Sequence, residues 1–333
     1  MKYYEKNQIE NWDKAIEEAA QVIRKGGLVA FPTETVYGLG ADAQNEQAVQ
    51  KIYVAKGRPA DNPLIVHIAH KEDLMKIAKD ISDWVLHITE KYWPGPLSVV
   101  LNRREDFCSA ASAGLSTVAV RMPDHETALA LIERSERYLA APSANISGRL
   151  SPTKGRHVAE DMREHADIIL AQDDLVLGLE STVIDARGSY PVILRTGCVT
   201  CEMLAADVGR AEIYDAAAEK PLAPGMKYVH YRPRAAVMIV DGNLEKKSEK
   251  IQSFLETEIK TGVFCSEKLS KNIQCKDVVT YRSLNEAAQK FYATLREFDE
   301  KGCRKILCEK VEQTGIGEAL VNRMENAAEG RYL

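Results

Sequence analysis

The sequence has no long hydrophobic run and no apolar segment at its start. A membrane-spanning helix needs about 20 consecutive apolar residues, and no run in the 333 residues approaches that length. Residues 1–6, Met-Lys-Tyr-Tyr-Glu-Lys, lack the apolar core of a signal peptide. We therefore expect a soluble protein that stays in the cytoplasm and does not enter a membrane.

Basic residues are not in excess. The chain has 44 Lys and Arg against 49 Asp and Glu, which gives a formal net charge of -5 at pH 7. No global positive field draws such a chain onto nucleic acid, so any RNA contact needs a local basic patch. The charge balance therefore argues against a protein that coats RNA.

Cysteines occur without regular spacing. Among the seven, only Cys198 and Cys201 form a C-x-x-C pair. Zinc usually takes four ligands, so we interpret this pair as ordinary thiols in a reducing compartment.

Glycine motifs for nucleotides are also missing. No GxxxxGK[ST] motif occurs, so ATP, if it binds, does not bind in a P-loop. Gly38 and Gly40 are separated from the preceding apolar stretch by residues 32–35, which argues against a dinucleotide-binding turn. Gly315-Ile316-Gly317 lacks a third glycine, and helix packing explains it better than a cofactor site.

Alternating strands and helices predict an α/β domain over residues 1–212. Apolar residues at helical spacing predict a helix over Trp12–Arg24, followed by the Gly26-Gly27 stop signal. Further helices are expected over Asp124–Arg134 and Val158–His165. Short apolar or β-branched runs predict strands at 28–31, 64–68, 97–101, 117–120, 168–171, 182–185 and 192–195. We expect a twisted, mixed sheet with helices.

A linker and a second domain follow. Residues 213–234 are rich in Ala, Pro and Gly, and prolines 221, 224 and 233 prevent a continuous helix. Residues 235–333 predict a smaller three-layer α/β domain of Rossmann-like topology. Its expected strands are 236–240, 262–265, 277–281 and 305–309, and its expected helices are 244–259, 284–299 and 317–328.

Two short segments offer groups that suit a polyphosphate. Lys56 and Arg58 are two positive charges on a loop bounded by Gly and Pro, and residues 143–148 read Ser-Ala-Asn-Ile-Ser-Gly. Lysine and arginine suit phosphate oxygens, while Ser and Asn add neutral hydrogen bonds. The alternative for Lys56 and Arg58 is that they are solvated loop charges.

This K-x-R and S-x-N pairing resembles the signature of the YrdC-like domain of threonylcarbamoyl-AMP synthases. The resemblance continues through the segments 32–39 (PTETVYGL), 62–64 (NPL), 93–96 (WPGP), 120–123 (VRMP) and 178–183 (GLESTV), in the family's order. Residues 223–228 and 230–231 are similar to the linker of the long, two-domain form. The similarity therefore covers nearly the whole chain.

The resemblance implies a reaction in which L-threonine, bicarbonate and ATP give threonylcarbamoyl-AMP, pyrophosphate and water. It implies Mg²⁺ as the ion that accompanies ATP. The product is expected to pass to the tRNA threonylcarbamoyl transferase machinery, which modifies adenosine next to the anticodon, and a weak direct contact with tRNA is left open.

The resemblance also assigns roles to individual residues. Lys56 and Arg58 are expected to be catalytic, by offsetting charge on the leaving pyrophosphate. ATP contacts are expected from Lys56, Arg58, Asn62, Thr117, Ser143, Asn145, Ser151, Arg195, His230 and Tyr231, the last two on a linker that folds over the site as a lid. Threonine contacts are expected from Thr35, His67, Arg121, Ala141 and Ser181.

Several of these residues also have structural interpretations. A lone histidine on an apolar strand, such as His67, is often a satisfied core residue. Arg121 ends a buried strand and needs an anion, which is either the substrate carboxylate or an internal Asp or Glu. Ser181 can be a strand-entry residue.

Two other functions use the same features. A concave basic cleft could hold double-stranded RNA, with Lys56 and Arg58 contacting phosphates. A related domain in hydrogenase-maturation proteins transfers a carbamoyl group from carbamoyl phosphate, but this chain lacks the acylphosphatase and zinc-finger regions expected there.

Overall fold

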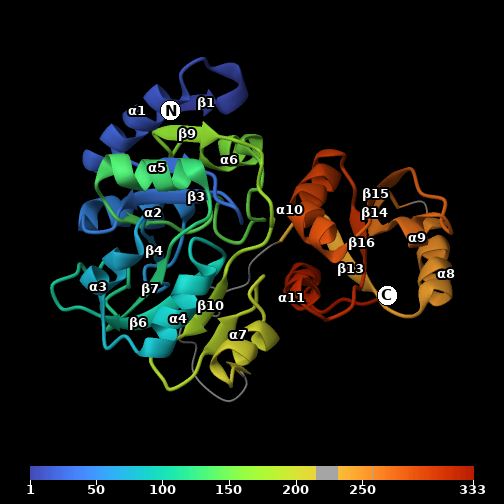
Figure 1. Ribbon diagram of the computed structural model, residues 1–333. Coiled ribbons are helices and arrows are strands. Elements are labelled where there is room, and N and C mark those ends of the chain that lie inside the picture. The colour runs from blue at the N-terminus through green and yellow to red at the C-terminus, as the bar shows by residue number, and fades with distance from the viewer. Residues whose placement is uncertain (215–231, 258) are drawn as a thin grey trace. The chain divides into compact units, whose positions relative to one another are not determined.

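The computed structural model describes residues 1–214, 232–257 and 259–333, which form two compact units (Figure 1). The first unit holds residues 1–147, 151–176 and 180–214 among those described, and the second holds 148–150, 177–179, 232–257 and 259–333. The predicted contacts of His230 and Tyr231 and most of the predicted linker lie outside the described residues.

The first unit is built on one mixed twelve-stranded sheet. Its main path runs in the order β1-β9-β2-β3-β8-β4-β7-β6-β10-β11-β12, with β5 paired to β6. The strands are β1 (Lys2–Glu5), β2 (Val29–Phe31), β3 (Gly38–Asp42), β4 (Ile65–His67), β5 (Ala78–Lys79), β6 (Leu97–Arg103), β7 (Thr117–Arg121), β8 (Leu139–Ala140), β9 (Ile168–Ala171), β10 (Thr182–Asp185), β11 (Val192–Arg195) and β12 (Glu212–Ile213).

Seven α-helices accompany this sheet among the described residues. They are α1 (Trp12–Arg24), α2 (Glu46–Lys56), α3 (Leu74–Ile77), α4 (Asp83–Tyr92), α5 (Glu126–Ser135), α6 (Gly155–Met162) and α7 (Cys201–Val208), with short 3₁₀ turns at Lys6–Gln8 and Lys71–Asp73. Helix α1 packs against α5, as Figure 1 shows at the blue end of the chain. The Asn11 side chain caps the first turn of α1 by accepting from Lys14 N at 2.9 Å.

Alternation along β2 divides the apolar core of this unit between two faces. Val29 and Phe31 belong to the cluster that includes the buried side chains of α1 and α5. Ala30, between them, belongs to the larger cluster on the other face, with Leu39 and Ile52. Successive side chains of a strand point to opposite faces, so the sheet is covered on both sides, as an α/β domain requires.

The predicted elements of this unit are confirmed, with shifted bounds for two helices. The helix expected at Val158–His165 spans Gly155–Met162 instead, and the one expected at Asp124–Arg134 spans Glu126–Ser135. The second begins late because the His125 ring acts as its cap: Nδ1 accepts from Thr127 N at 3.2 Å. Helices α2, α3, α4 and α7 and strands β1, β3, β5, β8 and β12 were not predicted.

The second unit contains a four-stranded, fully parallel sheet in the order β13-β16-β14-β15. The strands are β13 (Ala236–Val240), β14 (Thr261–Ser266), β15 (Asp277–Tyr281) and β16 (Lys305–Glu309), and the helices are α8 (Leu244–Leu255), α9 (Glu267–Ser270), α10 (Leu284–Glu300) and α11 (Ile316–Ala328). Helix α8 contacts α9, and α10 contacts α11, so the helices form two groups around the sheet (Figure 1). The predicted Rossmann-like pattern of strands and helices is confirmed.

Two details of the second unit correct or explain the sequence analysis. The helix expected to reach residue 259 ends at Leu255, where Thr257 Oγ1 donates to the Phe254 carbonyl at 2.7 Å. A Cβ on Gly317 would lie 2.0 Å from the Glu312 carbonyl oxygen, so this glycine is required by close packing. In the described part of the chain, no helix has the length and apolarity needed to cross a membrane.

Candidate functional site

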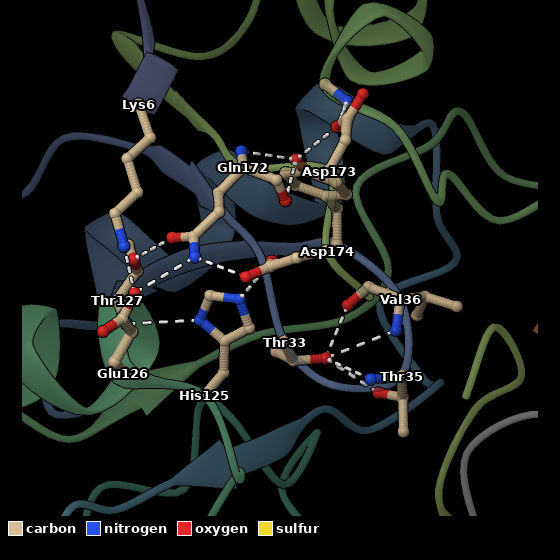
Figure 2. Close-up of polar contacts among 12 residues, drawn as sticks. Lys6, Thr33, Thr35, Val36, His125, Glu126, Thr127, Gln172, Asp173 and Asp174 are labelled. Carbon is tan, nitrogen blue, oxygen red and sulfur yellow. Dashed lines mark hydrogen bonds and ion pairs between the residues drawn. The ribbon is translucent and has the colours of Figure 1, made fainter. Parts of the chain in front are cut away.

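The loop after β2 is held in a tight turn by one hydroxyl. Thr33 Oγ1 donates to the Val36 carbonyl at 2.7 Å and accepts from the Thr35 and Val36 amides at 3.2 and 3.3 Å. It also lies 2.8 Å from Thr35 Oγ1. Figure 2 shows these contacts of the turn as dashed lines. Since the single Thr33 proton goes to Val36, Thr35 donates to Thr33. This turn fixes the direction of the Thr35 side chain.

Arg121 meets this turn from the end of β7. Its Nη2 lies 2.7 Å from Glu34 Oε1 and donates to Thr35 Oγ1 at 3.1 Å, while Nε donates to the Gly95 carbonyl at 3.2 Å. Both members of the ion pair are buried, with side-chain exposures of 5% for Arg121 and 6% for Glu34. The internal acid left open by the sequence analysis is therefore Glu34.

His67 ends β4 beside Arg121. The two residues are partners in the parallel register of β4 and β7. Nδ1 lies 3.2 Å from the Ile65 carbonyl, and the ring meets Phe31 edge-on at 6.3 Å. Burial, and secondarily the charge of Arg121, lowers the pKa of His67 to about 3. His67 is thus neutral at physiological pH and packed in the core.

Lys56 is the last residue of α2 and points inward. Its Nζ donates to the carbonyls of Ser143 and Asn145, and the residue is 2% exposed. Desolvation, and then the nearby Arg58, lowers the pKa of Lys56 well below its ordinary value. The lysine therefore anchors the predicted S-x-N loop.

Arg58 follows a left-handed residue, Gly57 (φ 58°, ψ 34°), and bonds the next turn. Its Nε donates to the Asn62 carbonyl at 3.1 Å and its Nη2 to the Pro63 carbonyl at 3.0 Å. The Asn62 Nδ2 atom is buried and donates to no group in the described residues. A buried amide without an acceptor is costly unless a ligand supplies one.

Ser181 and Arg195 are joined by two hydrogen bonds. Arg195 donates from Nε to the Ser181 carbonyl and from Nη2 to Ser181 Oγ, both at 3.0 Å. Ser181 Oγ also lies 2.8 Å from Ser98 Oγ. Ser151 Oγ donates to Glu180 Oε1 at 2.6 Å. Arg195 is thus hydrogen-bonded to Ser181, and Ser151 is hydrogen-bonded to Glu180, the residue before Ser181. The resemblance assigns Arg195 and Ser151 to ATP.

Strand register sorts the candidates into two groups. Continuing the pairing Ile65↔Ala119 back by two residues sets Thr117 opposite Pro63, and continuing Val66↔Ala140 sets Ser143 opposite Pro63 as well. We call the set at this end of β4 the Lys56 group: Lys56, Arg58, Asn62, Thr117, Ser143 and Asn145. The set in contact with or next to Arg121 we call the Arg121 group: Glu34, Thr35, His67, Ser98, Arg121, Ser181 and Arg195.

Arg121 and Thr117 lie at opposite ends of β7, but the turn that carries Glu34 and Thr35 runs next to the S-x-N loop, because Gly38 pairs with Ser143 and Ala144 N donates to the Tyr37 carbonyl at 2.8 Å. Thr117 and Arg121 are the first and last residues of β7, and four residues of strand span about 13 Å. Ala141 lies between the groups, with its amide donating to the Ile65 carbonyl at 2.9 Å. An elongated ligand with an anionic tail and a second polar end would fit this spacing.

Glu34 and Ser98 were missed as site residues. Glu34 stands inside the segment 32–39 on which the resemblance rests, between two threonines. A carboxylate directly after a buried strand, together with an arginine ending another, was a usable signal. Ser98 had none, because a single serine in the apolar run 97–101 is indistinguishable from a packing residue.

A second polar cluster lies beside the turn in Figure 2 and was not predicted. His125 Nε2 is 3.2 Å from Asp174 Oδ1, and Gln172 Nε2 donates to Asp174 and, at 3.1 Å, to Glu126. Lys6 completes the cluster by donating to Glu126. These bonds join the N-terminal segment to the loop after β9.

Comparison with known proteins accounts for both units. A family model described as "Telomere recombination" (Sua5_yciO_yrdC) matches residues 21–197, and one described as "Threonylcarbamoyl-AMP synthase, C-terminal domain" matches 199–329. The chain is 45% identical to threonylcarbamoyl-AMP synthase of Pyrococcus abyssi over 98% of this chain and 97% of that protein. It is 42% identical to that of Bacillus subtilis over 96% of this chain and 95% of the relative.

A solved structure gives the same result for the fold. The crystal structure of P. abyssi Sua5 complexed with L-threonine has a TM-score of 0.91 and 44% sequence identity, and the match covers 100% of this chain and 98% of that one. With similarity this high over both units, the chain belongs to the threonylcarbamoyl-AMP synthase family.

Proposed function

We propose that this chain is an L-threonylcarbamoyladenylate synthase, a nucleotidyltransferase that condenses L-threonine, bicarbonate and ATP to threonylcarbamoyl-AMP, pyrophosphate and water. Family membership supports the reaction. The observation that carries the assignment to this site is the buried Arg121 beside Thr35 and Glu34, because a desolvated arginine at a pocket of hydroxyls suits an amino-acid carboxylate.

The Arg121 group is the proposed threonine subsite. Arg121 binds the α-carboxylate, and Thr35 and Ser181 supply hydroxyls for the polar atoms of the substrate. His67 shapes the subsite as a neutral ring, and Ala141 borders it. One methyl group separates threonine from serine, which is worth only about 1–3 kcal/mol in an apolar pocket, so serine is the expected competitor.

The Lys56 group is the proposed nucleotide subsite. Arg58 binds the phosphates of ATP, Asn62 Nδ2 finds its missing acceptor there, and Thr117, Ser143 and Asn145 complete the polar lining. Lys56 fixes the S-x-N loop and adds positive charge. Ser151 and Arg195 contact ATP where it meets Ser181, and His230 and Tyr231, which lie outside the described residues, are further proposed ATP contacts.

ATP enters as its Mg²⁺ complex. The described residues contain no cluster of three or more His, Cys, Asp or Glu side chains that could hold a metal. In this proposal the phosphate oxygens of ATP would supply ligands to the cation, and the cation would help to neutralise the leaving pyrophosphate.

Chemistry in this arrangement depends on positioning. The threonine amine combines with bicarbonate to form a carbamate, which is unstable in water and benefits from a closed site. A carbamate oxygen then attacks the α-phosphorus of ATP while pyrophosphate leaves in line. The product passes, in the cytoplasm, to the machinery that modifies tRNA next to the anticodon.

The decisive experiment measures pyrophosphate release from ATP with threonine and bicarbonate added singly and together. Release that requires both co-substrates, and that falls by about 10²–10³ in Arg58→Ala, supports the proposal. Pyrophosphate release that does not depend on threonine would refute the proposal. Salt-sensitive binding of double-stranded RNA without any release would instead support the RNA-binding alternative.

A further inference from the structure

Glu34 is a buried carboxylate whose hydrogen-bonding capacity is not used. The residue is 5% exposed. Both of its carboxylate oxygens are buried and accept no hydrogen bond from the described residues. Oε1 lies 2.7 Å from Arg121 Nη2, but the two atoms are paired by charge and not by an aligned hydrogen bond. A carboxylate has about four acceptor positions, and burying them empty costs free energy.

The surroundings of Glu34 are otherwise well satisfied. Arg121 directs Nη2 at Thr35 Oγ1 and Nε at the Gly95 carbonyl. The Thr35 hydroxyl donates to Thr33, whose own proton goes to Val36. The turn therefore does not need the Glu34 oxygens for its shape, because the Thr33 hydroxyl already fixes it.

An amino acid brings two opposite charges on one carbon atom. The threonine contacts carried over from the family are Thr35, His67, Arg121, Ala141 and Ser181, and none of these side chains is an anion. Arg121 can bind the carboxylate of threonine, but the ammonium group needs hydrogen-bond acceptors within about 3 Å of it. Glu34 supplies a negative charge in direct contact with Arg121, which is where the ammonium of a zwitterion bound to that arginine would lie.

We propose that Glu34 binds the ammonium group of threonine and acts as the general base that deprotonates it; this inference rests on the proposed function. The ammonium transfers one proton to a Glu34 carboxylate oxygen and becomes a neutral amine. The amine nitrogen forms a bond to the carbon of bicarbonate, and the second N–H proton leaves with a bicarbonate hydroxyl as water. The proton on Glu34 returns to solvent when the product departs.

The other titratable groups in contact with this turn do not fit that role. His67 directs Nδ1 at the Ile65 carbonyl and also has a backbone hydrogen bond with Leu139. Arg121 is a cation. Tyr37, which follows the turn, donates to the Gln172 carbonyl at 2.9 Å and lies 3.0 Å from Asp173 Oδ1. Glu34 is the acceptor among them.

The test compares Glu34→Gln with wild type in threonine- and bicarbonate-dependent pyrophosphate release between pH 6.5 and 9.5. Loss of a general base lowers the rate by about 10²–10⁴. The deficit should narrow as pH rises, because a growing fraction of the threonine then has already lost its ammonium proton in solution. KM for ATP should not change.

A matched control removes a buried carboxylate that pairs with another arginine in the same unit. Asp42 is 8% exposed, and its Oδ2 lies 3.2 Å from Arg137 Nε. Asp42→Asn should keep the wild-type rate and pH profile. If Glu34→Gln changed only stability or KM, with a pH profile parallel to wild type, Glu34 would be a structural partner of Arg121 and the inference would be wrong.

A second measurement needs no variant. Calorimetric titration of the wild-type protein with L-threonine and with 3-hydroxybutanoate, which lacks only the ammonium group, should show at least tenfold weaker binding of the latter. Equal affinities would overturn the ammonium contact. An inactive wild-type protein would instead contradict the proposed function, since the inference requires an active enzyme with an impaired variant.

Discussion

The Arg121 group and the Lys56 group hold their positive charges in different ways. Arg121 is paired with the carboxylate of Glu34. Lys56 and Arg58 donate to the backbone carbonyls of Ser143, Asn145, Asn62 and Pro63. Burial and Arg58 lower the pKa of Lys56, and Asp161 is the nearby acid that raises it. Arg121 thus faces an internal carboxylate, whereas the side-chain hydrogen bonds described for Lys56 and Arg58 go to neutral carbonyls.

In the proposed function, this difference lets one sheet bind two unlike substrates. A ligand at the Arg121 group must compete with Glu34 for Arg121 or bind both residues. Binding there therefore selects ligands by the arrangement of their charges. A proposed ligand at the Lys56 group meets basic side chains that backbone carbonyls already hold in place. The variants below weaken either the Arg121 group or the Lys56 group.

Breaking the Glu34–Arg121 pair should have the largest effect. Arg121→Gln leaves the Glu34 charge buried without its partner, which typically costs about 3–5 kcal/mol of stability. Threonine-dependent pyrophosphate release should also fall at least 10²-fold. Urea unfolding measures the first effect, and the co-substrate assay measures the second.

Two further variants make that measurement specific. Arg187→Gln removes a more exposed arginine that pairs with Asp185 at 2.6 Å, and should cost no more than about 1 kcal/mol. The double variant Glu34→Gln/Arg121→Gln should recover much of the lost stability, because no uncompensated charge is left buried. A double variant as unstable as Arg121→Gln would show that the pair is not the cause.

Removing the buried ammonium should weaken the Lys56 group. Lys56→Met leaves the Ser143 and Asn145 carbonyls without their donor, at a cost of about 1–3 kcal/mol, and should raise KM for ATP more than KM for threonine. Lys51→Met is the matched control, since Lys51 lies on the same helix and its Nζ donates to the Gly26 carbonyl at 2.6 Å. Equal changes in both KM values would contradict the separation into two groups.

Acid should destabilise the fold through His67. Its pKa is near 6.5 when unfolded and about 3 when folded, so between these values the unfolded chain binds the extra proton. Stability is then complete above pH 6.5 and falls by about 1.4 kcal/mol per pH unit below it. His67→Phe should flatten this slope in urea titrations from pH 6.5 to 5, whereas the exposed His70→Gln should not.

The smallest effect is expected at Ser98. Ser98→Ala removes the 2.8 Å contact with Ser181 Oγ and should cost about 0.5–1.5 kcal/mol. KM for threonine should rise severalfold while KM for ATP stays constant, because Ser181 also remains bonded to Arg195. A shift in the ATP value alone would place this serine pair in the other group.

The sequence predicted the fold best where periodicity was strong. Helix α1 and strands β9, β15 and β16 have the expected bounds because their apolar spacing is regular and turn residues flank them. Strand β3 was missed because Gly38-Leu39-Gly40 contains two glycines, which disfavour strands. The structure explains one of them: a Cβ on Gly40 would lie 2.7 Å from Phe31 Cε1.

The candidate site was predicted by residue type more than by arrangement. An arginine at the end of a buried strand predicted an anionic partner, but only the fold could show that this partner is Glu34. Lys56 was expected in a loop, whereas it is the last residue of α2 and is buried. Contacts of this kind join residues 87 to 89 positions apart, and a single sequence carries no local signal for them.

Gly57, between Lys56 and Arg58, has a left-handed backbone conformation. Its φ of 58° and ψ of 34° are close to the mirror image of the helical conformation that precedes it, and this reversal sends Lys56 into the core and Arg58 toward the 62–63 turn. A Cβ built there meets nothing within 4 Å, so handedness and not space decides what the position accepts. L-alanine would be strained by about 1–2 kcal/mol, whereas D-alanine would sit in its own preferred conformation. The side chains of Lys56 and Arg58 point in different directions because Gly57, between them, has a left-handed backbone conformation.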